Sequence, residues 1–132
     1  MKGFIDTNIF IYTLEKHPRF GIKSKNILEK VDSAEIQAYT STLTLQEICW
    51  YLEADQKIPQ MREAVERILN SQVKIIQVPP SGILEATKLK QNFPKIELND
   101  LINYSLMKIK QIKRIYTNDR HFDKLPDIQR TF

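Results

Sequence analysis

Four acidic residues from distant parts of the chain either follow predicted strands or begin predicted helices: Asp6, Glu47, Asp100 and Asp119. Asp6 directly follows the first predicted strand, and one residue separates Asp119 from the strand that ends at Thr117. Glu47 and Asp100 are expected in the first turns of two later helices. Because ligands of parallel sheets bind beyond the carboxyl ends of the strands, we expect the four carboxylates to meet at that edge.

Four such carboxylates would form an acidic site suited to a hard cation. Neighbouring carboxylates raise one another's pKa and cost stability, and a bound divalent cation removes that cost. Ligands that are all oxygen favour Mg²⁺ or Mn²⁺. This arrangement suits phosphodiester hydrolysis, in which one ion activates water and a second, about 4 Å away, stabilises the leaving oxygen. The net charge of +4 permits a polyanionic partner such as RNA or DNA without requiring one.

Each acid also has an ordinary structural interpretation. Thr44 and Glu47 have the spacing of a capping box. Asp6 and Asp100 suit the N-caps of helices, and Asp119 is typical of a turn. The residue types alone leave both interpretations open.

The apolar pattern predicts alternating strands and helices. Expected strands cover residues 1–5, 35–39, 73–78 and 114–117, with a final edge strand at 128–132. Expected helices cover residues 9–15, 22–31, 45–52, 61–69, 82–93 and 98–109, and a polar break covers 40–42. Alternation of this kind predicts an α/β fold with a central, mostly parallel sheet flanked by helices.

Length and composition favour one domain, covering residues 1–132. With 42% hydrophobic and 27% charged residues, the chain has the composition of an ordinary soluble protein. Three glycines argue against a glycine-rich phosphate loop, and the single cysteine, Cys49, excludes an intrachain disulfide. No apolar run approaches the roughly 18 residues that span a membrane, and Asp6 comes too early for a signal peptide. We therefore expect a cytoplasmic protein that does not associate with membranes.

Four short segments carry a resemblance to a known family. They are Phe4-Ile5-Asp6-Thr7-Asn8-Ile9, Thr44-Leu45-Gln46-Glu47-Ile48, Leu98-Asn99-Asp100-Leu101-Ile102 and Tyr116-Thr117-Asn118-Asp119-Arg120-His121-Phe122. In this order, and over essentially the whole chain, they resemble the motifs of PIN-domain nucleases, in particular the small VapC-type toxins.

The resemblance implies a PIN-like fold and an Mg²⁺- or Mn²⁺-dependent endoribonuclease, the toxin of a type II toxin–antitoxin pair. It implies that the four acids hold the metal and activate water. Thr117 would form a hydrogen bond within the cluster and orient a carboxylate, and Asn8 would line the site. Implied partners are RNA, a cognate antitoxin and a second copy of the chain in a homodimer.

Other functions are compatible with parts of this pattern. A PIN nuclease with a housekeeping role in RNA processing and a catalytically silent RNA-binding PIN domain are the alternatives within the family. An aspartyl-phosphate phosphatase also has an Asp after its first strand, but it needs a second Asp where this chain has Asn8. The chain departs from many family members after Asp100, where Asn103 and Tyr104 stand in place of small residues.

Several further residues have open roles. We expect His121 to be a neutral surface residue, Asp123 to be a helix cap or solvent-exposed, and Cys49 to lie in the core. Trp50 and Tyr51 either pack internally or form an exposed patch. Two basic clusters are candidates for phosphate contact: a 16–25 cluster (Lys16, Arg19, Lys23, Lys25) and a 108–114 cluster (Lys108, Lys110, Lys113, Arg114). The 16–25 cluster is slightly preferred because it is closer in sequence to Asp6.

Overall fold

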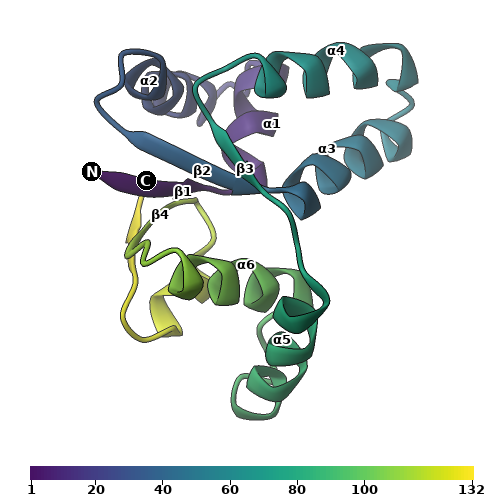
Figure 1. The fold of residues 1–132 in the computed structure, drawn as a ribbon. Coiled ribbons are helices and arrows are strands. Elements are labelled where there is room, and N and C mark those ends of the chain that lie inside the picture. The colour runs from purple at the N-terminus through teal and green to yellow at the C-terminus, as the bar shows by residue number, and fades with distance from the viewer.

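The computed structural model describes residues 1–132 as a five-stranded sheet between two layers of helices (Figure 1). The strands are β1 (Lys2–Ile5), β2 (Gln37–Ser41), β3 (Lys74–Ile76), β4 (Arg114–Tyr116) and β5 (Gln129–Thr131). The helices are α1 (Thr7–Glu15), α2 (Gly21–Asp32), α3 (Thr42–Ala54), α4 (Ile58–Leu69), α5 (Pro80–Asn92) and α6 (Leu98–Ile109), and a 3₁₀ helix η1 covers Arg120–Lys124. No helix has the length and apolar character needed to cross a membrane.

All neighbouring strands are parallel, in the order β3-β2-β1-β4-β5. The chain builds the sheet outward from β1 to β3, passes through α5 and α6, and returns to the other side of β1 as β4. The direction of building therefore reverses between β1 and β4, which are paired with Phe4 opposite Ile115. In parallel α/β sheets, ligands bind beyond the carboxyl ends of the strands at such a reversal.

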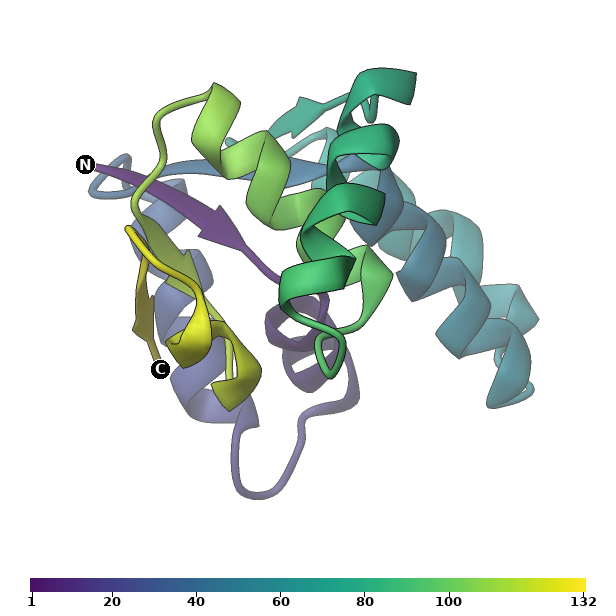
Figure 2. The ribbon, with the colours of Figure 1, turned by 90° about the horizontal axis from the view of Figure 1, so that it is seen from below.

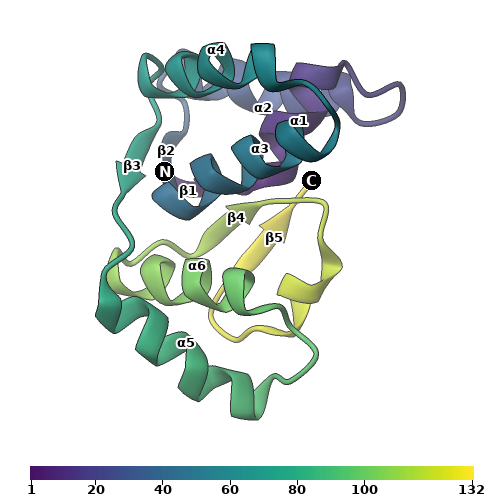
Figure 3. The same ribbon diagram turned by 90° about the vertical axis from the view of Figure 1, so that its right-hand side faces the viewer.

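The two faces of the sheet have separate apolar cores. Helices α1 to α4 cover one face, and α5, α6 and η1 cover the other (Figures 1 and 3). Because successive side chains of a strand point to opposite faces, Phe4 packs with α5 and α6, whereas Ile5 packs with α1 to α4. Burial on both faces explains why Phe4 and Ile5, next to each other in the central strand β1, are both apolar.

The expected α/β architecture with a parallel sheet is confirmed, and so is the edge strand at the C-terminal end. The expected polar break at 40–42 is wrong, because β2 continues through Ser41 and α3 begins at Thr42. These polar residues are buried with partners: the Thr40 hydroxyl donates to the Ile5 carbonyl (2.8 Å), and the Ser41 hydroxyl donates to Asn103 Oδ1 (2.7 Å). Hydrogen bonding of this kind makes burial of a polar strand residue tolerable.

The start of α3 also differs from the capping box expected at Thr44. The N-cap is Ser41, whose hydroxyl accepts from the Thr44 amide (3.2 Å). Glu47 consequently lies in the second turn of the helix rather than the first. On the same helix Cys49 is only half-buried, so its placement in the core is wrong, and Trp50 is 71% exposed.

Candidate active site

Asp6 is the most buried of the four acids, with 6% of its surface exposed. It follows β1 and is the N-cap of α1, where Oδ1 accepts from the Thr7 amide (2.8 Å). Burial, together with the charges of Glu47 and Asp119, raises its pKa to about 6 against the opposing effect of hydrogen bonds from Thr117 and Thr7. A cation bound beside this carboxylate would lower its pKa and favour the ionised form.

The Thr117 hydroxyl connects the ends of β1 and β4. It donates to Asp6 Oδ2 (2.6 Å) and accepts from the Asn8 side-chain amide (2.9 Å) and the Asp119 backbone amide (3.0 Å). Thr117 is completely buried. It therefore fixes the Asp6 carboxylate and the loop that carries Asp119, which is the hydrogen bond that the family resemblance implies.

Glu47 reaches the same place from α3. One of its oxygens accepts from the Thr7 hydroxyl (2.9 Å), so Thr7 joins Asp6 to Glu47, through its backbone amide on one side and its hydroxyl on the other. Burial raises the pKa of Glu47, hydrogen bonds from Thr7 and Asn99 oppose the rise, and the charge of Glu97 adds to it.

Asp100 lies in the first turn of α6, whose N-cap is Glu97 rather than Asp100 itself. Its carboxylate accepts no hydrogen bond from the rest of the protein. Burial raises its pKa well above the ordinary value, and the charges of Asp6, Asp119, Glu47 and Glu97 raise it further. The other three acids are therefore close enough to repel it.

Asp119 is partly exposed and is the N-cap of η1, where Oδ1 accepts from the His121 amide (2.9 Å). The same oxygen lies 3.0 Å from His121 Nδ1. His121 is thus a half-exposed residue in contact with the site. Asp123 is exposed and paired with Arg130 (2.9 Å), which lowers its pKa, so it does not join the four acids.

The structure therefore brings Asp6, Glu47, Asp100 and Asp119 together at the carboxyl ends of β1 and β4. Their roles stay predictions. No three His, Cys, Asp or Glu side chains are already arranged as a closed set of metal ligands. The donors are nonetheless all oxygen, and buried carboxylates that repel one another suit a hard divalent cation.

Three neighbours of the acids were not singled out in the sequence. Thr7 bridges Asp6 and Glu47, Asn99 stabilises ionised Glu47, and Glu97 adds negative charge beside Glu47 and Asp100. In the sequence, the position of Thr7 between Asp6 and Asn8 could have indicated its role. Asn99 and Glu97 could have been found from their positions just before Asp100.

Asn103 lies one turn below Asp100 and is 1% exposed. Its Oδ1 accepts from the Ser41 hydroxyl (2.7 Å), and Ser41 caps the helix that carries Glu47. Its amide nitrogen has no partner, and neither has the buried Thr44 hydroxyl. Asn103, one of the residues that depart from the family pattern, therefore links α6 to the start of α3 through its hydrogen bond with Ser41.

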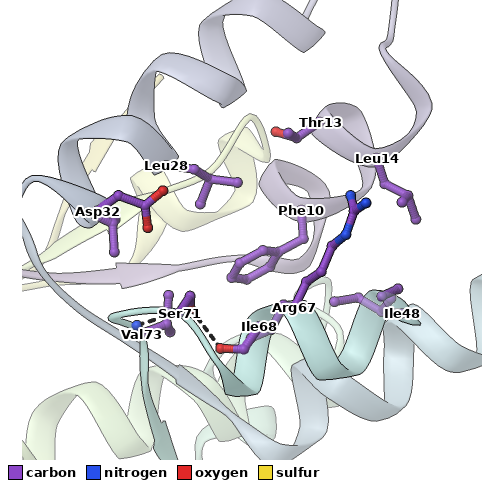
Figure 4. A pocket seen from close by; sticks show the side chains of 12 residues that line it. Phe10, Thr13, Leu14, Leu28, Asp32, Ile48, Arg67, Ile68, Ser71 and Val73 are labelled. Atoms are coloured by element: carbon purple, nitrogen blue, oxygen red, sulfur yellow. Dashed lines mark hydrogen bonds between the residues drawn. The ribbon is translucent and has the colours of Figure 1, made fainter. Parts of the chain in front are cut away.

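A separate apolar hollow of about 200 Å³ lies among α1, α2, α3 and α4 (Figure 4). Phe10, Leu28 and Ile68 contribute to its walls, and Arg67 and Asp32 lie at its border. None of the four acids lines it, so the acidic site is a different part of the molecule.

Comparison with known proteins agrees with this fold. The family model of the PIN domain matches residues 3–128. Ribonuclease VapC13 of Mycobacterium tuberculosis is 22% identical over 126 residues, which cover 96% of this chain and 96% of that protein. VapC ribonuclease Mb1869c of Mycobacterium bovis has the same identity and coverage.

Two solved structures have similar folds. The structure of VapBC2 from Rickettsia felis, bound to a DNA fragment from their promoter, matches with a TM-score of 0.76 and 23% identity, covering 99% of this chain and 98% of that one. The structure of VapC20 from Mycobacterium tuberculosis, described as a Sarcin-Ricin loop cleaving toxin, matches with a TM-score of 0.78 and 16% identity over 92% of each chain.

A parallel α/β sheet with acids at the reversal between β1 and β4 defines the class of protein. The chain belongs to the PIN-domain family.

Proposed function

We propose that this chain is a divalent-metal-dependent endoribonuclease and the toxin of a type II toxin–antitoxin pair. The observation that carries the proposal is the meeting of four acids from the ends of β1 and β4 and from α3 and α6. Glu47 and Asp119 raise the pKa of Asp6, and these three acids together raise the pKa of Asp100. Such crowding costs folding stability unless a cation occupies the site, so it is best explained by function.

Asp6, Glu47, Asp100 and Asp119 would hold Mg²⁺ or Mn²⁺. When bound, the ion supplies positive charge that stabilises the phosphate in the transition state and makes water more acidic. The N-terminal ends of α1 and α6 carry the positive ends of the helix dipoles, which favour ionised acids. Asp6 caps α1, and Asp100 lies in the first turn of α6.

The protein's own groups then divide the remaining work. Asp6 is fixed by Thr7 and Thr117 and cannot turn away from the site. Asp100 has no hydrogen-bond donor within the protein, so its oxygens are free to bind the cation. Burial and the charges of Asp6, Asp119 and Glu47 raise its pKa, and a cation held beside it would oppose that rise and favour the ionised form.

The substrate and partners follow from the relatives. Two curated relatives are named ribonucleases, and several similar structures are toxin–antitoxin complexes, including one from Klebsiella pneumoniae. We propose RNA as the substrate, a cognate antitoxin as inhibitor, assembly as a homodimer and a cytoplasmic location.

The test is cleavage of a labelled single-stranded RNA by purified protein, with Mg²⁺, with Mn²⁺ and with excess EDTA. We expect cleavage with either ion, none with EDTA, and none by Asp6→Asn. Asp127→Asn is the matched control: Asp127 is exposed beside Lys113, away from the acids, and its φ of 65° is well tolerated by Asn. Wild-type rates in Asp6→Asn, or full activity in EDTA, would refute the proposal.

A growth assay separates the toxin from a housekeeping nuclease. Induced expression of the wild-type chain should arrest growth, expression of Asp6→Asn should not, and co-expression of a cognate antitoxin should restore growth. RNA cleavage without growth arrest would favour the housekeeping role.

A further inference from the structure

A group of aromatic side chains lies at the same edge of the sheet as the four acids. This aromatic cluster consists of Tyr12, His17, Phe20 and Phe132. The ring centres of Tyr12 and Phe20 are 5.1 Å apart, and those of Phe20 and Phe132 are 5.5 Å apart. The Tyr12 hydroxyl accepts from the Asn118 side-chain amide (3.2 Å). Because Asn118 lies between Thr117 and Asp119, the aromatic cluster adjoins the candidate active site.

Three exposed cations surround the aromatic cluster: Lys16, Arg19 and Lys23. The Arg19 guanidinium lies 5.2 Å from the ring centre of Phe20, and Lys23 Nζ lies 4.8 Å from that of Phe132. None of the three forms an ion pair with an acid, so their charge is available to a ligand. Lys25, the fourth member of the 16–25 cluster, differs because it pairs with Glu29 (4.0 Å).

The loop that carries Lys16 and Arg19 and leads to Lys23 on α2 has a fixed conformation. His17 Nδ1 accepts from the backbone amides of both Arg19 and Phe20 (3.1 Å each). The His17 ring also stacks on Phe20 at 4.9 Å and 20°. A charged group on a constrained loop loses less conformational freedom on binding. Figure 2 shows this loop between α1 and α2, with the end of β5 beside α2.

The 108–114 cluster lies at the opposite edge of the sheet, since it ends at Arg114, the first residue of β4. There the Lys110 carbonyl accepts from Lys2 Nζ at the start of β1 (3.2 Å). Arg114 is already engaged by Thr131 and Gln129 of β5. A phosphate positioned at the proposed cation site between the four acids is therefore approached by the 16–25 cluster and not by the 108–114 cluster.

We propose that Lys16, Arg19 and Lys23 bind the phosphates of the RNA strand next to the scissile phosphate, so that the strand crosses the α1–α2 loop as it leaves the carboxylates. The aromatic rings hold two of these cations in place. A cationic surface is needed there because the four acids repel the strand electrostatically on either side of the reacting phosphate. This inference rests on the proposed function.

The experiment measures binding of a fluorescent single-stranded RNA by anisotropy, with Asp6→Asn in every protein so that the RNA stays intact. The test variant adds Arg19→Gln and Lys23→Gln, which keep the side-chain stems on the aromatic rings. The matched control adds Lys108→Gln and Lys113→Gln instead. Lys108 also lies over an aromatic ring, that of Tyr104 (5.4 Å), so the two variants lose equal charge in similar surroundings.

Each phosphate contact adds roughly 0.7 to the slope with which log affinity falls as log salt concentration rises. One contact therefore strengthens binding about fivefold at 0.1 M salt relative to 1 M salt. The test variant should therefore bind ~25-fold more weakly at 0.1 M salt and almost as well as the parent at 1 M, with a slope lower by roughly 1.4. The control should stay within about twofold at both salts, as expected of charges outside the contact.

Equal losses in the two variants would overturn the inference, because the effect would then be one of net charge. A loss that persists at 1 M salt would overturn it as well, because phosphate contact is screened. Cleavage by the protein without Asp6→Asn is measured separately. Absence of any RNA cleavage there would refute the proposed function, whereas cleavage together with equal losses would refute this inference alone.

Discussion

The metal-free protein should lose stability as pH rises, because Asp6 is buried. An unfolded aspartate ionises near 3.8, whereas folded Asp6 ionises at about 6. Below 3.8 both states are protonated and Asp6 has no effect. Between 3.8 and 6 only the unfolded state releases its proton, so the free energy of unfolding falls as pH rises. At 1.36 kcal/mol for each pH unit, the loss approaches about 3 kcal/mol above pH 6.

The assay is urea unfolding in chelator at pH values from 4 to 7, for the wild type and for Asp6→Asn. The difference between the two proteins cancels the titrating groups that do not interact with Asp6, and it includes the effect of the Asp6 charge on Asp100. It should shift by about 2.4 kcal/mol in favour of the variant from pH 4 to 7, since part of the loss occurs below pH 4. Asp127→Asn is the control and should follow the wild type. A difference between wild type and Asp6→Asn that stays constant from pH 4 to 7 would refute the reasoning.

Three further substitutions test the supports of the site by thermal unfolding. Thr117→Val removes the donor to Asp6 Oδ2 and two accepted hydrogen bonds, so we expect a loss of about 3 kcal/mol. Asn103→Leu leaves the buried Ser41 hydroxyl without its acceptor and should cost about 2 kcal/mol, with weaker Mn²⁺ binding by calorimetry. Gly3→Ala places a Cβ 2.5 Å from the Tyr116 ring, which should cost about 2 kcal/mol. A melting temperature equal to that of the wild type would contradict each expectation in turn.

Much of the fold is predictable from this sequence because burial on both faces of a parallel sheet leaves a strong signal. The strands around Ile5 and Ile115 are apolar runs, and each is followed by an acid at its carboxyl end. Position after a strand and before a helix is a local property, so Asp6 and Asp119 are found without knowledge of the packing. The order of the strands then determines that these two acids are neighbours.

The errors occur where a polar residue is buried with a distant partner. Thr40 and Ser41 resemble a loop in the sequence, but their hydroxyls reach Ile5 and Asn103. Thr44 and Glu47 have capping-box spacing, yet Ser41 provides the cap. A pattern of residue types does not contain the contacts of Thr40 with Ile5 and of Ser41 with Asn103, because they join residues 35 and 62 positions apart. The Ser41 cap is local, but the interpretation of residues 40–42 as a break conceals it. The role of Thr7 as a bridge between two acids depends on tertiary structure in the same way.

The most direct test of the central claim is the anomalous scattering of Mn²⁺ in crystals of the protein soaked with the ion. The account predicts a peak about 2 Å from an oxygen of Asp6 and within reach of at least one of Glu47, Asp100 and Asp119. The peak should be absent from crystals of Asp6→Asn soaked in the same way. Density for Mn²⁺ only at other surfaces, with the four acids well ordered and without it, would contradict the claim that they form a cation site.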